Sequence, residues 1–430
     1  MAAALNQVWT ALDGGPNELP RLRVTGPPTT LRSTFAVTEA AAAAVGAALL
    51  AATLGTGAAV ELDTRGLAVA LRSERYLRRD GRSPGSPFDP LSAFHRTVDG
   101  WLRLHANYPW HRAAALRVLG CPEADAPAVI AGRNAVELET ALHRAGGVGA
   151  AVRTEPGWRT IAGPPPPLVE YQLLGPAPAR RPRRPRVLDL TRVIAGPVGT
   201  RTLAAHGADV LRIDAPDRPE LPLQYWDTLP GKRSAVLDLG AHPDLLEQLL
   251  AGADVVITGY RPGALDRFGL APEALAQRHP GLVVVTLSAW GYRGPWAGRR
   301  GFDSLVQAAC GIAVAEGGAG TPGALPAQAL DHVTGYLAAA AALLTLARQR
   351  REGGSHLVRL SLIGTAAWLQ RLPRAAATDV EEVDPAPHLV EVDAPDGRLT
   401  LAAPPGTVDG RSLTWPDPPP LFGTAEPRWL

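Results

Sequence analysis

An aspartate at the start of an apolar, helix-like segment is the first residue that could perform chemistry. Asp303 follows Gly301 and Phe302 and opens the segment 303–311. An Asp at this position commonly accepts hydrogen bonds from the N–H groups of its own helix, which would make it a simple N-cap. The same donors favour the ionised carboxylate, which is the form that nucleophilic catalysis needs. The local pattern leaves both roles open.

A glycine-containing turn between a predicted strand and a predicted helix could bind an anion. It spans residues 195–199 and includes Ala195, Gly196 and Pro197. A helix N-terminus offers free N–H groups and a partial positive charge, which suit a phosphate. The next strand ends in Asp214, as in dinucleotide-binding folds, but the Gly-x-x-Gly spacing with its internal proline does not match their fingerprint. A plain turn and an anion site remain as hypotheses.

Two further loops carry basic residues beside glycines. Residues 231–234 contain Lys232 and Arg233, and Lys232 is the only lysine of the sequence. Neighbouring surface charges are commonly just solvated, but beside a glycine they could also contact a phosphate. In residues 258–263, Arg261 directly follows an apolar strand, where open α/β sheets bind their ligands. For both loops a structural role and a binding role stay open.

An aromatic patch with histidines could line a pocket or simply pack. It contains His105, Tyr108, Trp110 and His111. No pair of histidines shows the spacing of metal ligands on one helix face, and neither a Gly-x-Ser-x-Gly elbow nor a Walker loop occurs. We therefore expect no metal site.

These residues must be positioned by alternating strands and helices that begin near Arg186. Helices are expected through 203–206 and over 242–250. Apolar runs predict strands at 186–190, 209–214, 235–239, 254–257 and 282–286. Strands separated by helices indicate βαβ units with a parallel sheet. We predict an α/β fold with a Rossmann-like parallel-sheet domain and a smaller α+β domain.

Composition divides the chain into five segments. Residues 1–80 form an Ala-rich helix and strand segment that resembles a repeat of 331–370, with the Val-Thr pairs at 37–38 and 333–334 in register. Residues 81–162 form the small α+β domain, with a hairpin at 94–104 that turns at Asp-Gly. The remaining segments are a Pro/Arg linker at 163–185, the Rossmann-like domain at 186–375 and a C-terminal closing segment at 376–430.

The overall composition indicates a cytoplasmic, soluble protein without a charged macromolecular partner. Lys and Arg total 43 against 41 Asp and Glu, so no strong field attracts nucleic acid or an anionic membrane. The two cysteines, Cys121 and Cys310, fit a reducing compartment. The apolar stretch 40–54 is shorter than the roughly 20 residues that span a bilayer, and the N-terminus has no basic region typical of a signal peptide.

Taken in order, the motifs resemble the class III CoA-transferases, the family of formyl-CoA transferase, carnitine CoA-transferase and α-methylacyl-CoA racemase. Single motifs are weak, but six in sequence are specific. The matching stretches are 186–197, 203–210, 231–239, 253–263, 291–295 and Phe302-Asp303 with Gln307-Ala308. The resemblance implies that this part of the chain binds coenzyme A as an acyl-CoA substrate.

The resemblance also implies a mechanism. Asp303 would attack the acyl-CoA thioester, giving a mixed anhydride and then an aspartyl-CoA thioester, from which CoA passes to a small carboxylic acid. Loop N–H groups would stabilise the oxyanions. Residues 195–197, Lys232, Arg233 and Arg261 are expected near CoA, and His105, Tyr108 and Trp110 near the acyl group.

The order of the segments departs from that of the family. The family's first domain begins here near Arg186, while 94–158 resembles its smaller second domain and 389–429 its closing segment. The chain therefore looks permuted, or like a trimmed tandem duplication. A homodimer is expected, but its interlocking would depend on linkers that differ here. Phe302 replaces the histidine typical of racemases, which favours a transferase. A racemase with Asp303 as general base, or a CoA-binding protein without activity, remain the alternatives.

Overall fold

The computed structural model describes residues 1–181, 184–318, 320–375 and 380–430. Residues 182–183 of the predicted linker and 376–379 at the start of the predicted closing segment lie outside the described residues.

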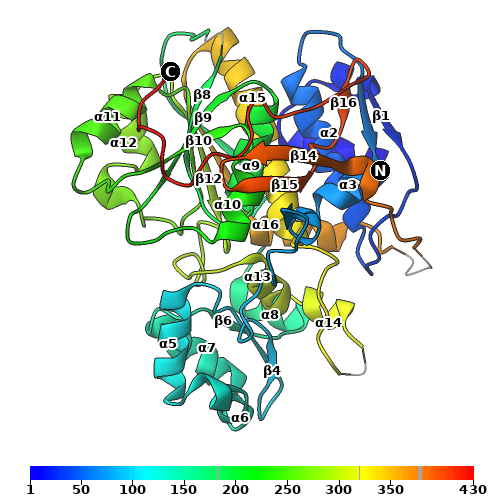
Figure 1. Ribbon diagram of the computed structural model, residues 1–430, viewed down its shortest axis with the longest axis vertical. Coiled ribbons are helices and arrows are strands. Elements are labelled where there is room, and N and C mark those ends of the chain that lie inside the picture. The colour runs from blue at the N-terminus through cyan, green and yellow to red at the C-terminus, as the bar shows by residue number, and fades with distance from the viewer. Residues whose placement is uncertain (182–183, 319, 376–379) are drawn as a thin grey trace.

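A mostly parallel sheet forms the centre of the molecule (Figure 1). In the described residues it has seven strands in the order β10-β9-β8-β11-β12-β13-β7, and only the edge strand β7 runs antiparallel to its neighbour. The strands are β7 (Glu170–Gly175), β8 (Arg186–Leu190), β9 (Asp209–Asp214), β10 (Lys232–Val236), β11 (Val255–Thr258), β12 (Val283–Ser288) and β13 (Ser355–Ser361). This confirms the predicted α/β class.

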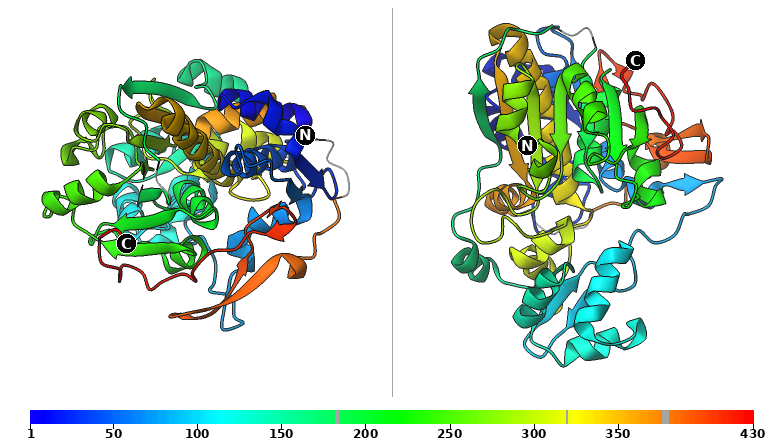
Figure 2. Two further views of the ribbon diagram at one scale, coloured as in Figure 1. Left: turned by 90° about the horizontal axis from the view of Figure 1, so that it is seen from above. Right: turned by 90° about the vertical axis from the view of Figure 1, so that its left-hand side faces the viewer.

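Helices cover both faces of this sheet, which explains its continuous apolar strands. Residues that alternate along a strand, such as Val187 and Leu188, belong to different cores on opposite faces. Helices α9 (Ala195–Ala205) and α15 (Ala329–Glu352) contribute to the first core, and α11 (Pro243–Gly252) and α12 (Pro272–Arg278) to the second. Figure 2 shows the same layers from two further sides.

The turn predicted at residues 195–199 is instead the first turn of α9. Pro197 is tolerated there because the first helical N–H groups have no partner within the helix. The actual turn precedes it and contains Val193, whose φ of 68° is unusual for a β-branched residue. Its N–H donates to Glu220 Oε2 over 3.0 Å, which holds the turn in this conformation.

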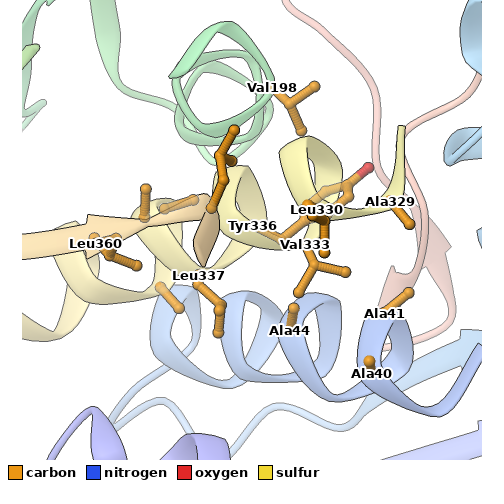
Figure 3. Packing of buried hydrophobic residues seen from close by; sticks show 14 of the residues in the cluster. Ala40, Ala41, Ala44, Val198, Ala329, Leu330, Val333, Tyr336, Leu337 and Leu360 are labelled. Carbon is orange, nitrogen blue, oxygen red and sulfur yellow. The ribbon is translucent and has the colours of Figure 1, made fainter. Parts of the chain in front are cut away.

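The Ala-rich helix α2 (Val37–Ala52) packs on α15 (Figure 3). Small side chains let the two helices approach closely, as at Ala41 and Ala44 opposite Val333. Each helix is followed by a strand and a further helix: β2 (Val60–Asp63) and α3 (Thr64–Ala70) after α2, and β13 and α16 (Leu362–Arg371) after α15. By length and composition α15 could span a membrane, but most of it is buried in this core.

The predicted small unit contains its own sheet and core. Strands β4 (Phe94–Arg96), β5 (Trp101–Leu104) and β6 (Gly149–Ala151) pair antiparallel, with the expected hairpin turn between β4 and β5. The helices of this unit are α5 (Pro109–Leu119), η2 (Glu123–Asp125), α6 (Ala126–Ala131), α7 (Ala135–Arg144) and α8 (Glu155–Ala162).

Strands from the two ends of the chain share sheets. β14 (Leu389–Ala394) and β15 (Gly397–Ala402) join β3 (Arg78–Arg79), while β16 (Thr407–Val408) and β17 (Arg411–Ser412) join β2 and β1 (Leu22–Thr25). The first 80 residues therefore do not form a separate body. The remaining elements are α1 (Ala2–Ala11), η1 (Pro16–Arg21), α4 (Ser73–Tyr76), α10 (Pro222–Thr228), η3 (Asp266–Phe268), α13 (Asp303–Ala309), α14 (Ile312–Glu316) and η4 (Ala386–His388).

Candidate functional site

A cavity of about 780 Å³ lies at the carboxyl ends of the parallel strands. Its wall includes residues that end or follow β8, β9, β10, β11 and β12, the edge at which open α/β sheets bind ligands. On another side it is walled by Tyr108, Trp110 and His111 of the small unit. The cavity therefore joins residues from before and after the Pro/Arg linker.

The Asp303 carboxylate is fully buried and is bound from two directions. Oδ2 accepts a hydrogen bond of 3.0 Å from the N–H of Asp331, and Oδ1 accepts one from Nε2 of Gln307. Gln307 Oε1 in turn accepts the N–H of Leu325 over 2.8 Å, which fixes the orientation of the amide. Asp303 is not the N-cap of its own helix α13, because its donor N–H lies in the first turn of α15. The simple N-cap hypothesis is therefore wrong.

Burial and hydrogen bonding act on the Asp303 carboxyl in opposite directions. Burial disfavours the charged form and raises the pKa, whereas the hydrogen bonds from the start of α15 and from Gln307 lower it. Burial has the larger effect, so the pKa of Asp303 is raised to about 6. At neutral pH the Asp303 carboxyl is therefore ionised in most molecules, although it binds a proton more readily than an ordinary Asp does. A carboxylate with this property is a suitable nucleophile.

Asp303 lies directly behind the cavity wall and does not itself line the cavity. Its neighbour Phe302 and its hydrogen-bond partner Asp331 are both in the wall. The ring of Phe302 stacks on His105 of the small unit, with centroids 3.8 Å apart. Phe302 and His105 thus connect the start of α13 to the small unit.

The three residues predicted for the acyl pocket have different positions. Tyr108 and Trp110 line the cavity, but His105 does not. Burial is the main reason that the pKa of His105 is lowered to about 3, with His111 and Arg103 adding to the effect, so its ring is neutral. We correct the His105 prediction to a packing residue behind Phe302.

The expected phosphate contact of Lys232 is also corrected. Its Nζ is buried, 3.1 Å from Asp189 Oδ2 and 2.9 Å from the carbonyl oxygen of Pro197. Lys232 begins strand β10, whereas the cavity lies at the other end of that strand. Its role in this structure is to hold α9 and β8 together.

Arg233 and Pro197 likewise do not line the cavity. Arg233 forms an ion pair with Asp209 over 2.8 Å and donates to the carbonyl oxygen of Arg428. The carbonyl oxygen of Pro197 is turned to Lys232. By contrast Ala195 and Gly196, the two residues before Pro197, are in the cavity wall as expected.

Arg261 lines the cavity as part of a cluster of arginines. Arg218 and Arg300 are in the same wall. Burial lowers the pKa of Arg300, and the positive charges of Arg261 and Arg218 lower it further. Among the described residues no acidic side chain forms an ion pair with Arg261 or Arg300. Arginines that repel one another without a counter-charge favour binding of an anion such as a phosphate.

Further arginine and aromatic contacts lie next to this cluster. Arg192 is 5.0 Å from the ring centroid of Tyr108 and 3.6 Å from Glu220, and Arg218 is 4.8 Å from the ring centroid of Trp110. Such surfaces can stack on planar groups. Arg192, Arg218, Arg300 and Asp331 were not among the site residues predicted from the sequence. The Arg-Arg pair at 299–300, two residues before Phe302, was the available signal for Arg300.

Residues 185–394 match the model of CoA-transferase family III. This part of the chain is therefore similar to that family. The first residue matched, 185, agrees with the expected start near Arg186. Among the residues that the structure describes, no group of three or more His, Cys, Asp or Glu side chains could hold a metal ion.

Named relatives match the same half of the chain. An acetyl-coenzyme A transferase, nodX, of Hypoxylon pulicicidum is 35% identical over 44% of this chain and 34% of its own length. A probable fatty acyl-CoA transferase, Rv3272, of Mycobacterium tuberculosis is 32% identical over 49% of this chain and 60% of its own length. An acetyl-CoA:oxalate CoA-transferase of Acetobacter aceti is 32% identical over 43% of this chain and 51% of its own length. The chain thus spans between a third and three fifths of these relatives.

Solved structures are similar to part of this chain. The crystal structure of Rv3272 from Mycobacterium tuberculosis is 31% identical, with a TM-score of 0.41 over 45% of this chain and 58% of that one. A CAIB/BAIF family protein from Brucella suis is 24% identical, with a TM-score of 0.39 over 51% and 65%.

Arg261→Ala should weaken binding of CoA by about tenfold or more, because a charge-assisted hydrogen bond to phosphate contributes roughly 1.5–3 kcal/mol. Binding of pantetheine, which lacks the phosphates of CoA, should hardly change. Calorimetric titration of both ligands measures the difference. The matched comparison is Lys232→Ala, which should lower stability and leave the affinity ratio of the two ligands unchanged. Equal losses for both ligands in Arg261→Ala would contradict a phosphate role.

Proposed function

We propose that this chain transfers CoA between an acyl-CoA thioester and a carboxylic acid, with Asp303 as the nucleophile. The observation that carries the proposal is the position of Asp303. Its carboxylate is bound at the start of α15, directly behind the wall of a cavity. That wall includes Arg261 and Arg300, which form no ion pair with an acidic side chain among the described residues. Asp303 lies in the segment that matches the model of CoA-transferase family III.

The reaction proceeds by covalent steps on this carboxylate. An Asp303 oxygen attacks the thioester carbon, the C–S bond breaks, and a mixed anhydride and CoA thiolate result. The thiolate attacks the aspartyl carbon of the anhydride, which releases the first carboxylate and leaves an aspartyl-CoA thioester. The acceptor carboxylate then attacks this thioester, the C–S bond breaks, and a second mixed anhydride forms between the acceptor and Asp303. CoA thiolate attacks the acceptor's carbon in this anhydride, which gives the acceptor's CoA thioester and releases the Asp303 carboxylate.

Binding of CoA uses the cavity wall. Arg218, Arg261 and Arg300 take the phosphates, and the Tyr108 and Trp110 surface contacts planar or apolar parts of the substrate. Because Asp303 is fully buried, access of the thioester requires the wall at Phe302 to shift. The stack of Phe302 on His105 links such a shift to movement of the small unit.

Trapping of the covalent intermediate tests the proposal. The protein is incubated with acetyl-CoA or succinyl-CoA and then with hydroxylamine, which converts an aspartyl thioester to a hydroxamate. Peptide mass spectrometry should locate the hydroxamate at Asp303. Oxalate, malate and citramalate are suitable first acceptors, since relatives are named for them. Absence of both hydroxamate and CoA exchange across acyl-CoA and acid panels would refute the proposal.

A further inference from the structure

A second buried carboxyl group, that of Asp331, lies beside Asp303 and lines the cavity. Asp331 is in the first turn of α15 and is only 6% exposed. Its backbone N–H donates to Asp303, so the two residues are adjacent. No described residue donates a hydrogen bond to the Asp331 carboxyl. Its oxygens are nevertheless not among the buried polar atoms that lack a partner, so they are accessible to solvent. Its carboxyl therefore faces the cavity.

The start of α15 is packed against its neighbours, which helps to position this carboxyl. Ala329, Leu330 and Val333 around it are buried, and they pack toward Ala40 and Ala41 of α2 (Figure 3). The helix-start N–H groups that would favour an ionised carboxylate are directed at Asp303. In the part of the chain that the structure describes, no N–H group donates such a hydrogen bond to the Asp331 carboxyl.

The charged groups around Asp331 favour its protonated form. Burial raises its pKa well above the ordinary value, and the negative charges of Asp303 on α13 and Glu74 on α4 raise it further. The other titratable groups nearby are His332, which is 3.8 Å from Glu74, and Arg103 on β5, which acts on Asp303. Burial and these negative charges therefore favour the carboxylic acid form of Asp331, which has an O–H to donate.

We propose that Asp331 is a catalytic hydrogen-bond donor, which binds the thioester carbonyl oxygen while Asp303 attacks the carbonyl carbon. This role rests on the proposed CoA transfer. As Asp303 adds to the carbon, the C=O electron pair moves onto oxygen, and the O–H of Asp331 stabilises the resulting oxyanion without transferring its proton. A protonated aspartic acid in an apolar site is known to serve an enzyme as such a donor.

Two substitutions distinguish a donor from other roles. Asp331→Ala removes the donor, and kcat should fall about 10²- to 10³-fold with little change in KM for acyl-CoA. Asp331→Asn retains an N–H donor of similar size, and its kcat should stay within about tenfold of the unchanged protein. Thermal melting of both variants reports whether they fold.

The pH dependence gives a second, independent readout. Because the pKa of Asp331 is raised, the O–H is present below that pKa and is lost as pH rises through it. The kcat of the unchanged protein should therefore fall at high pH, whereas Asp331→Asn should show no such fall. If Asp331→Ala does not fold, this comparison alone decides the matter.

Several outcomes would overturn the inference. Asp331→Asn as inactive as Asp331→Ala would indicate that a charged carboxylate is needed. Near-normal kcat in Asp331→Ala, or an unchanged high-pH fall in Asp331→Asn, would exclude the donor role while CoA transfer by the unchanged protein stands. Lack of transfer by the unchanged protein would instead overturn the proposed function and this role together.

Discussion

Asp303→Asn should lower kcat for CoA transfer by at least about a thousandfold and should abolish the hydroxylamine-trapped product. The amide has nearly the volume of the carboxylate but cannot form the anhydride or the aspartyl thioester, so the covalent route is lost. Transfer is measured as acyl-CoA exchange followed by chromatography. Asp244→Asn, on the exposed side of α11, is the matched control and should retain full activity. Full activity in Asp303→Asn would remove Asp303 from the mechanism.

The stability of the same variant should depend on pH in a defined direction. The pKa of Asp303 is raised to about 6 by burial, so the carboxyl stabilises the fold below its unfolded pKa and loses this contribution as pH rises through 6. Asn does not titrate. Relative to the unchanged protein, the unfolding free energy of Asp303→Asn should therefore rise by on the order of 3 kcal/mol between about pH 4 and pH 7. Urea unfolding at both pH values measures the change.

Gly335→Ala should destabilise the protein by about 1–3 kcal/mol, because it overpacks the contact between α15 and α9. A Cβ at Gly335 would lie 2.4 Å from the carbonyl oxygen of Ala195, and one at Gly199 would lie 2.8 Å from that of Gly335. These are backbone atoms that cannot rotate away. Since Ala195 and Gly196 line the cavity, a displaced α9 should also weaken CoA binding.

A matched glycine substitution checks that space is the cause. Gly298 is exposed, does not have a positive φ, and has no atom within 4 Å of the place its Cβ would take. Gly298→Ala should change the unfolding free energy by less than about 0.5 kcal/mol. Normal stability and normal CoA affinity in Gly335→Ala would show that α9 and α15 can separate without cost.

The local sequence predicted which strands and turns occur around the site better than it predicted where the helices begin. The hairpin at 94–104 and strand 209–214 were predicted correctly, because turn chemistry and apolar runs act over a few residues. Residues 195–199 were predicted as a turn before a helix through 203–206, but they form the first turn of α9, which begins at Ala195. Glycine and proline there indicate a turn locally, but the close approach of α15 allows them to begin a helix.

The sequence alone determined that an α/β fold holds an aspartate at the end of an ordered set of motifs, since strand periodicity and motif order are properties of the chain itself. Only the tertiary structure decided what each charge does. Lys232 is paired with Asp189, 43 positions away, and Asp303 takes its N–H from Asp331 on another helix. Hydrogen bonds and burial set the role of a charged group, and both depend on residues that folding brings together from distant parts of the chain.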